Sequence, residues 1–457
     1  MCEIGRSAVA VVLLSVGCAF TGPEPLRPAA EIAAAPLPAE SLREALLALH
    51  NPLLADRPVD WSDGLDPDEA ALFAAANNPE LRAARAARAE AAAELLEAGL
   101  FPNPVFGGDA AQPTSGPDSD SLVLSYGLSL SIDTQSLVTR SARVGAARAN
   151  VASVDLGLAW QEWQVAQAAR LETVRVGRLR RRLEVARAEV EFLEETTGNL
   201  ERALARGDTS LLTLGVQRAA LETARQVHRD LESAEASSES TLLLRLGMPP
   251  ETPLEVSTPD PPQMTATLVE LRAASGECLT RRLDLEALRA GYDAQEARLR
   301  QAVLEQLPAV TVGLSRQRNE SQIRFLGGFV SASLPVFDHA QGRIALADAT
   351  RERLAREFEA RVIEARSELD ALERALEIGR RHLSDVERAL PELTRLEASE
   401  RDAANRGDVD RVAYQAVRSA LFDLRLTQES LAQAQAETAI GLELACGGPL
   451  ALAEQRS

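Results

Sequence analysis

The sequence predicts a mainly α-helical fold with a smaller β part that crosses a membrane, built from two copies of one unit. Three observations predict this class. Arg206-Gly207-Asp208 recurs 200 residues later as Arg406-Gly407-Asp408. Apolar residues before each Gly follow a heptad spacing, which is typical of helices that supercoil around neighbouring helices. Other short segments alternate apolar and polar residues, which indicates β-strands with two unlike faces.

The repeat extends well beyond the shared Arg-Gly-Asp. We interpret it as a tandem duplication because the register holds over a long stretch on both sides of the Gly. The aligned pairs at a spacing of 200 include Leu183 with Leu383, Val190 with Leu390, Leu193 with Leu393, Arg218 with Arg418, Leu221 with Leu421, Leu231 with Leu431 and Leu242 with Leu442.

Each copy contains one long helix that ends at the Gly. The first is predicted from about Ser136 to about Ala205, which at about 1.5 Å per residue is on the order of 100 Å. Gly permits a tight reversal after the helix, and we expect Asp208 and Asp408 to act as N-caps of the helices that return. Each copy is thus a helical hairpin with an exposed end. The predicted seams are Val176, Leu179, Leu183, Ala186, Val190, Leu193, Leu200 and Leu204, and Leu369, Leu372, Leu376, Gly379, Leu383, Val386, Leu390 and Leu393.

Each copy also contains a pair of strands. Residues 122–132 alternate apolar and polar side chains over the length that a tilted membrane strand needs, and 105–110 is a shorter candidate before them. In the second copy, alternation begins at Val310, a polar loop is expected over 316–322, and a further strand leads to Phe337. Four strands are too few to close a barrel, so several chains must supply it.

The N-terminus has the features of an export signal. A short apolar run, 8–16, follows Arg6 and is too short to span a bilayer. Small residues before Cys18 resemble a bacterial lipobox, which predicts a lipidated Cys18 at the start of the mature chain, and plain cleavage is the alternative. Ala19 resembles the sorting pattern of lipoproteins sent to the outer membrane. No later apolar run approaches the roughly 20 residues of a membrane helix.

The net charge, the motifs and the residue spacings argue against several classes of function. The formal charge of -19 argues against nucleic acid as a partner. No nucleophile–base arrangement or phosphate-binding Gly loop is present, so we expect neither an enzyme nor a cofactor. His228 has no partner at helical spacing, so no metal site is predicted. Cys278 and Cys446 are expected to be two unpaired thiols, because their spacing suggests neither a metal knuckle nor a disulfide framework.

Several segments resemble the recurring junctions of the TolC family of outer-membrane efflux proteins, over about residues 66–445. The segments are Asn78-Pro79-Glu80-Leu81-Arg82, Gly99-Leu100-Phe101-Pro102-Asn103-Pro104, Leu307-Pro308, Leu334-Pro335-Val336-Phe337-Asp338 and Gln341-Gly342-Arg343. The sequences of these segments are most similar to those of the branch that serves cobalt-zinc-cadmium and other heavy-metal cation efflux.

The resemblance implies a homotrimer with a 12-stranded transmembrane barrel in the outer membrane of a Gram-negative bacterium and a periplasmic α-helical tunnel. It implies a passive gated duct that carries substrate, heavy-metal cations in this branch, from an inner-membrane pump of RND type and its periplasmic adaptor (membrane fusion protein). Two alternatives stay open. One is a structural periplasmic coiled-coil or adaptor protein, and the other is a TolC-type duct for drug efflux or type I protein secretion.

The expected organisation follows the repeat. It comprises a signal peptide (1–17), a lipid-anchored extended segment (18–65), a first repeat (66–260) with a β-hairpin at about 105–132 and a tip at 206–209, a second repeat (261–445) with a β-hairpin at about 309–337 and a tip at 406–409, and a C-terminal tail (446–457).

The two tips are the expected docking surface for the adaptor, because a long helix reverses at each and both lie farthest from the strands. The residues are Arg206, Gly207, Asp208, Thr209, Arg406, Gly407 and Asp408. Carboxylates shortly before the second tip are candidates for an acidic ring at the entrance, which would favour cations. The alternative is a solvated helix flank. These carboxylates are Glu397, Glu400 and Asp402.

Overall fold

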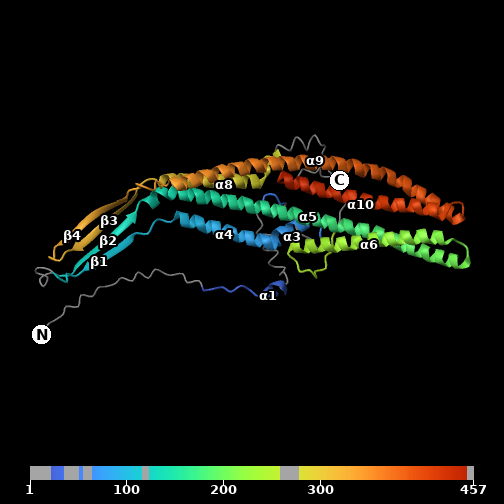
Figure 1. The fold of residues 1–457 in the computed structure, drawn as a ribbon, viewed down its shortest axis with the longest axis horizontal. Helices are drawn as coiled ribbons and strands as arrows, with labels where there is room; N and C mark the ends of the chain where they lie inside the picture. Colours follow the sequence, from blue (N-terminus) through green and yellow to red (C-terminus); the bar gives the residue numbers. More distant parts are fainter. Residues whose placement is uncertain (1–21, 35–50, 55–63, 116–122, 258–276, 450–457) are drawn as a thin grey trace, which may run out of the picture. The chain divides into compact units, whose positions relative to one another are not determined.

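The computed structural model describes residues 22–34, 51–54, 64–115, 123–257 and 277–449 (Figure 1). The chain divides into two units. The first, Met1–Leu37, contributes the short helix α1 (Ala29–Ala34). The second, Pro38–Ser457, contains every other described element. These are α3 (Pro67–Asn77), α4 (Pro79–Gly99), β1 (Val105–Ala111), β2 (Ser125–Asp133), α5 (Gln135–Arg206), α6 (Leu211–Leu246), α8 (Leu283–Leu304), β3 (Ala309–Arg318), β4 (Arg324–Ser333), α9 (Gln341–Arg406) and α10 (Arg411–Cys446).

The predicted fold class is confirmed, with long helical hairpins and four strands. We call α5 with α6 the first hairpin and α9 with α10 the second hairpin. Their elements keep the spacing of 200: α5 and α9 end at Arg206 and Arg406, and α6 and α10 have 36 residues each. The tandem duplication predicted from the sequence is therefore also present in the lengths and end points of the helices.

Helix α5 is the element against which most others pack. It has 72 residues, and it contacts α3, α4, α6, α8 and α10. Val176, Leu179, Ala186, Leu193 and Leu200 of the predicted seam are buried. Repeated burial every seventh residue holds α6 along one side of α5. None of the described helices contains an apolar stretch long enough to cross a membrane.

The seam of α9 is only partly covered within one chain. Leu369 and Leu376 are buried in a cluster with Leu442 of α10, but from Leu383 to Leu393 the seam residues are half-buried. A half-buried apolar row contributes less to stability than a covered one, because the free energy follows the area removed from water.

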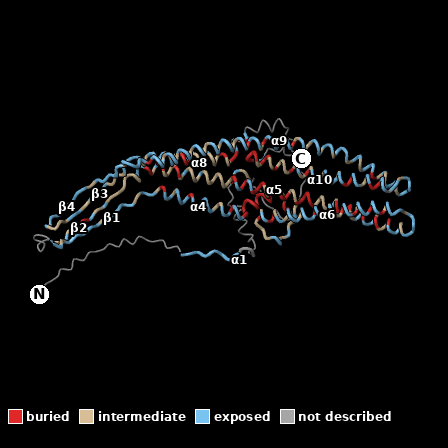
Figure 2. The backbone as a smooth tube through the Cα atoms, in the orientation of Figure 1, coloured by how far each residue is buried: buried red, intermediate tan, exposed pale blue. Residues whose placement is uncertain are grey.

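Helix α3 begins the first repeat and is buried on nearly every side (Figure 2). Asp66 caps it, accepting from the Glu69 backbone N–H at 2.8 Å while the Glu69 carboxylate accepts from the Asp66 N–H at 3.1 Å. Ala71 and Ala75 then pack against Ala166 of α5. Small side chains let the two backbones approach closely, so α3 fixes where α4 and the strands begin.

The strands form one antiparallel sheet in the order β1-β2-β3-β4. Two predicted strand limits are corrected. Strand β2 begins at Ser125, not at residue 122, which lies outside the described residues. Strand β3 continues to Arg318, opposite Arg324 of β4, so the loop predicted over 316–322 shrinks to 319–323. Polar side chains misled the prediction, since a ladder needs only backbone groups.

Cys278 and Cys446 form a disulfide, so the prediction of two unpaired thiols is wrong. Both cysteines are buried, in the cluster of Leu369, Leu376 and Leu442. They are 168 residues apart in the sequence. The end of α10 folds back beside the start of the second repeat, and this long-range contact leaves no trace in the local spacing.

Candidate functional site

The two hairpin tips, residues 206–209 and 406–409, have the same backbone. Gly207 and Gly407 adopt left-handed conformations with φ of 79° and 82°, which favours Gly over other residues. Asp208 N–H donates to Ala203 C=O and Asp408 N–H to Ala403 C=O, both at 2.9 Å. This bond closes the helix end in the Schellman pattern.

The acidic residues of the tips do not cap the returning helices, which corrects the prediction. Arg206 Nε lies 2.9 Å from Asp208 Oδ2, and Arg406 Nε lies 2.8 Å from Asp408 Oδ2. Two further residues separate each Asp from the helix start. Ser210 therefore caps α6 and Asp410 caps α10, accepting from Thr213 N–H at 3.1 Å and Val412 N–H at 3.2 Å.

Arg206 and Arg406 remain available to a partner. The side chains of both arginines are about two-thirds exposed, at 66% and 65%. An exposed ion pair contributes roughly 0 to 1 kcal/mol to stability. Each arginine can therefore leave its ion pair with the tip aspartate and bind a group on a partner protein at little cost in free energy. Thr209 completes the first tip and is half-buried.

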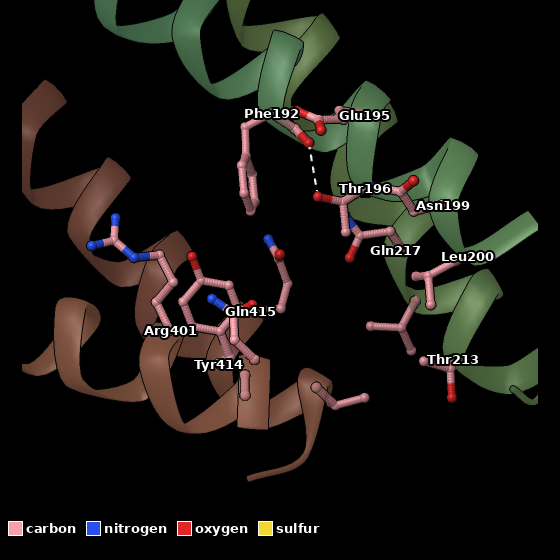
Figure 3. Close-up of a pocket in the computed structure, with 14 residues that line it drawn as sticks. Phe192, Glu195, Thr196, Asn199, Leu200, Thr213, Gln217, Arg401, Tyr414 and Gln415 are labelled. Atoms are coloured by element: carbon pink, nitrogen blue, oxygen red, sulfur yellow. Dashed lines mark hydrogen bonds between the residues drawn. The ribbon is translucent and has the colours of Figure 1, made fainter. Parts of the chain in front are cut away.

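A pocket of about 270 Å³ lies between the ends of the two hairpins (Figure 3). Phe192 and Asn199 of α5 and Gln217 of α6 line one side, and Arg401 of α9 and Tyr414 of α10 line the other. Tyr414 and Phe192 meet edge to face, with ring centroids 6.4 Å apart. The hairpins are therefore joined by side chains on one side of the pocket.

Arg418 of α10 is the centre of that junction. Its guanidinium lies 2.9 Å from Glu189 Oε2 of α5 and 3.6 Å from Glu397 Oε1 of α9. It also stacks over the Phe192 ring, 3.3 Å from the centroid. Tyr414 O–H donates to Glu397 Oε1 at 2.9 Å. One cation thus holds carboxylates from two helices, and removing it would leave buried charge unpaired.

Burial raises the pKa of the Glu189 carboxyl above its ordinary value, and Arg418 offsets part of that rise. Burial also raises the pKa of Tyr414, and its bond to Glu397 adds to the effect. Both shifts follow from placing ionisable groups in a poorly solvated contact between helices. The tyrosine stays protonated and remains a donor to Glu397.

The candidate acidic-ring residues occupy three different environments. Glu397 is buried and bound to Tyr414. Glu400 is half-buried and Asp402 is exposed. The structure therefore does not bring the three together on one open surface, and only the last two are available to line an entrance.

The sheet has one apolar and one polar face. Side chains directly opposite one another in a ladder lie on the same face. One such row contains Phe106, Leu130 and Leu314, and Val312 pairs with Val330 on the same side. The other face carries the row Gly107, Ser129 and Ser315. Strands β1 and β4 are edge strands, and each pairs on one side only among the described residues.

A second junction, around Arg282, closes the second repeat beside the disulfide. Arg282 is 1% exposed. Its guanidinium bonds to Asp284 Oδ2 at 2.7 Å and Ala445 C=O at 3.2 Å, and it lies over the Trp160 ring at 4.9 Å. In the first repeat side-chain amides hold the equivalent helix end. There Asn77 donates to Leu246 C=O at 2.6 Å and Asn78 to Arg245 C=O at 2.9 Å.

Cys18, His228 and metal binding were also considered in the sequence predictions. Cys18 lies outside the described residues. His228 is half-buried on α6. Within the described ranges, no group of three His, Cys, Asp or Glu side chains is arranged to hold a metal ion.

Sequence reasoning missed the two junctions. Arg418 aligns with Arg218 at the repeat spacing, but nothing in that alignment distinguishes a buried arginine from an exposed one. At the repeat spacing Arg282 aligns with Arg82, which is exposed, and in the first repeat Asn77 and Asn78 bind the corresponding helix end. The alignment therefore contains no signal that Arg282 is buried.

The overall fold is similar to that of several outer-membrane proteins of known structure. No family model matches the chain, and no curated protein matches its sequence. Among solved structures it is similar to CusC, with a TM-score of 0.70 and 18% identity over 93% of this chain and 99% of that one. OprN gives 0.72 and 16% over 94% and 99%, and VceC of Vibrio cholerae 0.69 and 15% over 84% and 96%. The fold is therefore TolC-like.

Proposed function

We propose that this chain is one subunit of a trimeric outer-membrane efflux duct of the TolC family. The observation that carries the proposal is a sheet with one apolar face and two open edges, joined to two long helical hairpins. Within the described part of the chain, β1 and β4 each have one edge of unpaired backbone groups, and these groups must be satisfied before the sheet can enter lipid. Three copies joined edge to edge would close a 12-stranded barrel.

The helices support assembly with further copies. The seam of α9 from Leu383 to Leu393 is half-buried in the single chain, and Ile363 and Ile378 of the same helix are 70% and 44% exposed. Neighbouring hairpins would cover these side chains in a closed tunnel. An acidic chain, with a formal charge of -19, suits a water-filled path for cations.

The proposal also includes the partners, the substrate and the membrane anchor. We assign the two tips to a periplasmic adaptor and, beyond it, an inner-membrane pump of RND type. Heavy-metal cations are the proposed substrate, on the resemblance of the junction segments. Cys18 is proposed to carry lipid that anchors the chain to the outer membrane. The duct itself binds no cofactor and performs no reaction.

Membrane insertion and assembly test the function directly. The full chain, expressed with its own signal, should fractionate with outer membranes, run as a heat-modifiable trimer and conduct ions in planar bilayers. A water-soluble, wholly helical product would overturn the proposal and favour a periplasmic coiled-coil or adaptor protein.

Mass spectrometry of the mature N-terminus tests the lipid anchor, since an unmodified first residue other than Cys18 would contradict it.

Deletion of the gene tests the substrate. Growth on zinc, cobalt and cadmium should fall if heavy-metal cations pass through the duct. Unchanged metal tolerance with greater sensitivity to drugs would favour a drug-efflux duct, and loss of a secreted protein would favour type I secretion.

A further inference from the structure

The apolar face of the sheet ends in three arginines. Arg316 and Arg318 lie near the end of β3, and Arg324 begins β4. Only the turn 319–323 separates the two strands, so the arginines lie at the end of the sheet that is farthest along the strands from α8 and α9 (Figure 1).

The register places all three side chains on the apolar face. Arg318 is opposite both Tyr126 and Arg324. The next row toward the helices contains Leu128, Arg316 and Leu326. The rows after it contain Leu130 with Leu314, and Ile132 with Val312 and Val330. The face therefore changes along its length from wholly apolar to apolar with arginine, and ends with tyrosine and arginine.

Among the residues that the structure describes, these arginines have no acidic partners. None of the three guanidiniums makes an ion pair or hydrogen bond with a side chain in the part of the chain that the structure describes, which includes Glu320 in the turn. Elsewhere the chain pairs its arginines freely, as Arg343 does with Glu305 at 3.0 Å. Three unpaired cations on one small surface favour an anionic ligand.

The neighbouring side chains identify the kind of ligand. Leu314 and Leu326 are 65% and 81% exposed, so an apolar partner must cover the face. Arginine on a lipid-facing strand is strongly destabilising at the middle of a bilayer but is tolerated near its surface. Tyrosine is also enriched at that surface. An apolar face with a rim of arginine and tyrosine fits acyl chains with phosphate above them.

We propose that Arg316, Arg318 and Arg324 bind the phosphate groups of a phosphorylated glycolipid in the outer leaflet. This inference rests on the proposed function, because that function puts the helices on the periplasmic side and the turn 319–323 on the outer side. A glycolipid of this kind carries phosphates on the sugars to which its acyl chains are attached. The acyl chains cover Leu314 and Leu326, and the guanidiniums bind phosphate oxygens in pairs.

The test uses the full-length trimer in phosphatidylcholine bicelles, titrated with deep-rough lipopolysaccharide. A second titration uses the same lipid after its phosphates are removed, and a third uses phosphatidylglycerol. The variant is Arg316→Gln with Arg318→Gln and Arg324→Gln. The matched control, Arg353→Gln with Arg356→Gln and Arg388→Gln, removes three exposed arginines of α9.

We expect the wild type and the control to bind the phosphorylated glycolipid more tightly than either other lipid. The sheet variant should bind it on the order of a hundredfold more weakly, from roughly fivefold per basic residue at a membrane surface. Equal affinities for the phosphorylated and dephosphorylated lipid would overturn the inference, and that comparison needs no variant. Tighter binding of phosphatidylglycerol would overturn it as well.

The two proposals fail in different ways. A trimer that inserts and conducts but does not distinguish the lipids leaves the duct intact and removes only the glycolipid site. A chain that does not insert at all removes the duct, and the glycolipid site with it.

Discussion

Arg418 shows how one side chain acquires a role that its duplicate lacks. It is 20% exposed and pairs with Glu189, which is 8% exposed. Arg218, its counterpart in the first repeat, pairs with Glu201 in solvent, and their side chains are 59% and 48% exposed. The same residue type at the same repeat position is thus a buried link between hairpins in one copy and a surface ion pair in the other.

We expect Arg418→Met to destabilise the chain by about 3 to 5 kcal/mol, because Glu189 and Glu397 would lose their shared cation in a poorly solvated contact. The matched control Arg218→Met should cost less than about 1 kcal/mol. Urea unfolding of the detergent-solubilised protein, followed by circular dichroism, measures both. Equal costs in the two variants would show that the junction is not energetically distinct.

Asp284 predicts a specific response to acid. Burial raises the pKa of its carboxyl, but the guanidiniums of Arg282 and Arg361 lower it, and the net shift is below the ordinary value of 3.8. A lowered folded-state pKa stabilises the fold above the ordinary value, and this stabilisation is lost as the pH falls through the folded-state pKa. Acid should therefore weaken the Arg282 junction.

Asp284→Asn should cost about 3 kcal/mol at neutral pH, since Arg282 is almost fully buried and would lose its closest carboxylate. The difference from wild type should begin to shrink below the ordinary pKa of 3.8, where the unfolded chain takes up the proton, and should vanish as the pH falls through the lower folded-state pKa. Unfolding free energies between pH 7 and pH 2.5 test this. A difference that stays constant across that range would assign the cost to packing alone.

At the scale of the element, the polar face of the sheet contains a glycine that is covered by an aromatic ring. A Cβ at Gly313 would lie 2.6 Å from the Phe329 ring and 2.7 Å from Leu130 C=O. The aromatic ring thus covers the glycine of the neighbouring strand. On the same face, Gly327 has nothing within 4 Å of the equivalent position.

Gly313→Ala should therefore disturb the ladder between β2, β3 and β4 and lower the yield of heat-modifiable trimer several-fold. Gly327→Ala, the control, should assemble at the wild-type level. Unheated electrophoresis of outer-membrane fractions compares the two yields. Normal assembly of Gly313→Ala would show that the Phe329 ring can move away.

Elements with a long hydrophobic periodicity could be predicted from the sequence. Features that depend on a single contact between distant residues could not. Residues 136–205 gave helix α5 almost to the residue, because a heptad seam leaves its mark on every turn. The helix caps were wrong at Asp208 and Asp408, because two extra turn residues move the cap to position 210 or 410. The disulfide and the Arg282 junction were missed, because both join segments that are distant in the sequence.

At the scale of the whole molecule, the tips are the surfaces that the proposed assembly would present to its adaptor. We expect Arg206→Glu with Arg406→Glu to preserve folding, trimer formation and membrane insertion, because both arginines are exposed and make only surface ion pairs. Export and adaptor cross-linking should fall at least severalfold, since the charge at both tips is reversed.

The control for the tips is Arg353→Glu with Arg356→Glu, which reverses two exposed charges of α9 far along the helix from residue 406. It should leave cross-linking unchanged. If the tip variant also retains wild-type cross-linking and export, the tips are only turns and the adaptor binds elsewhere.

The disulfide also sets an order of events during biogenesis. Cys446 follows Cys278 by 168 residues, so Cys278 cannot form its disulfide until that whole stretch has been synthesised and exported. The first repeat has no such dependence, because Asn77 and Asn78 bind the end of α6 within residues that emerge much earlier. A chain halted between residues 278 and 446 would thus have the end of α6 bound but no disulfide in the second repeat. The disulfide therefore forms only in chains that extend through residue 446.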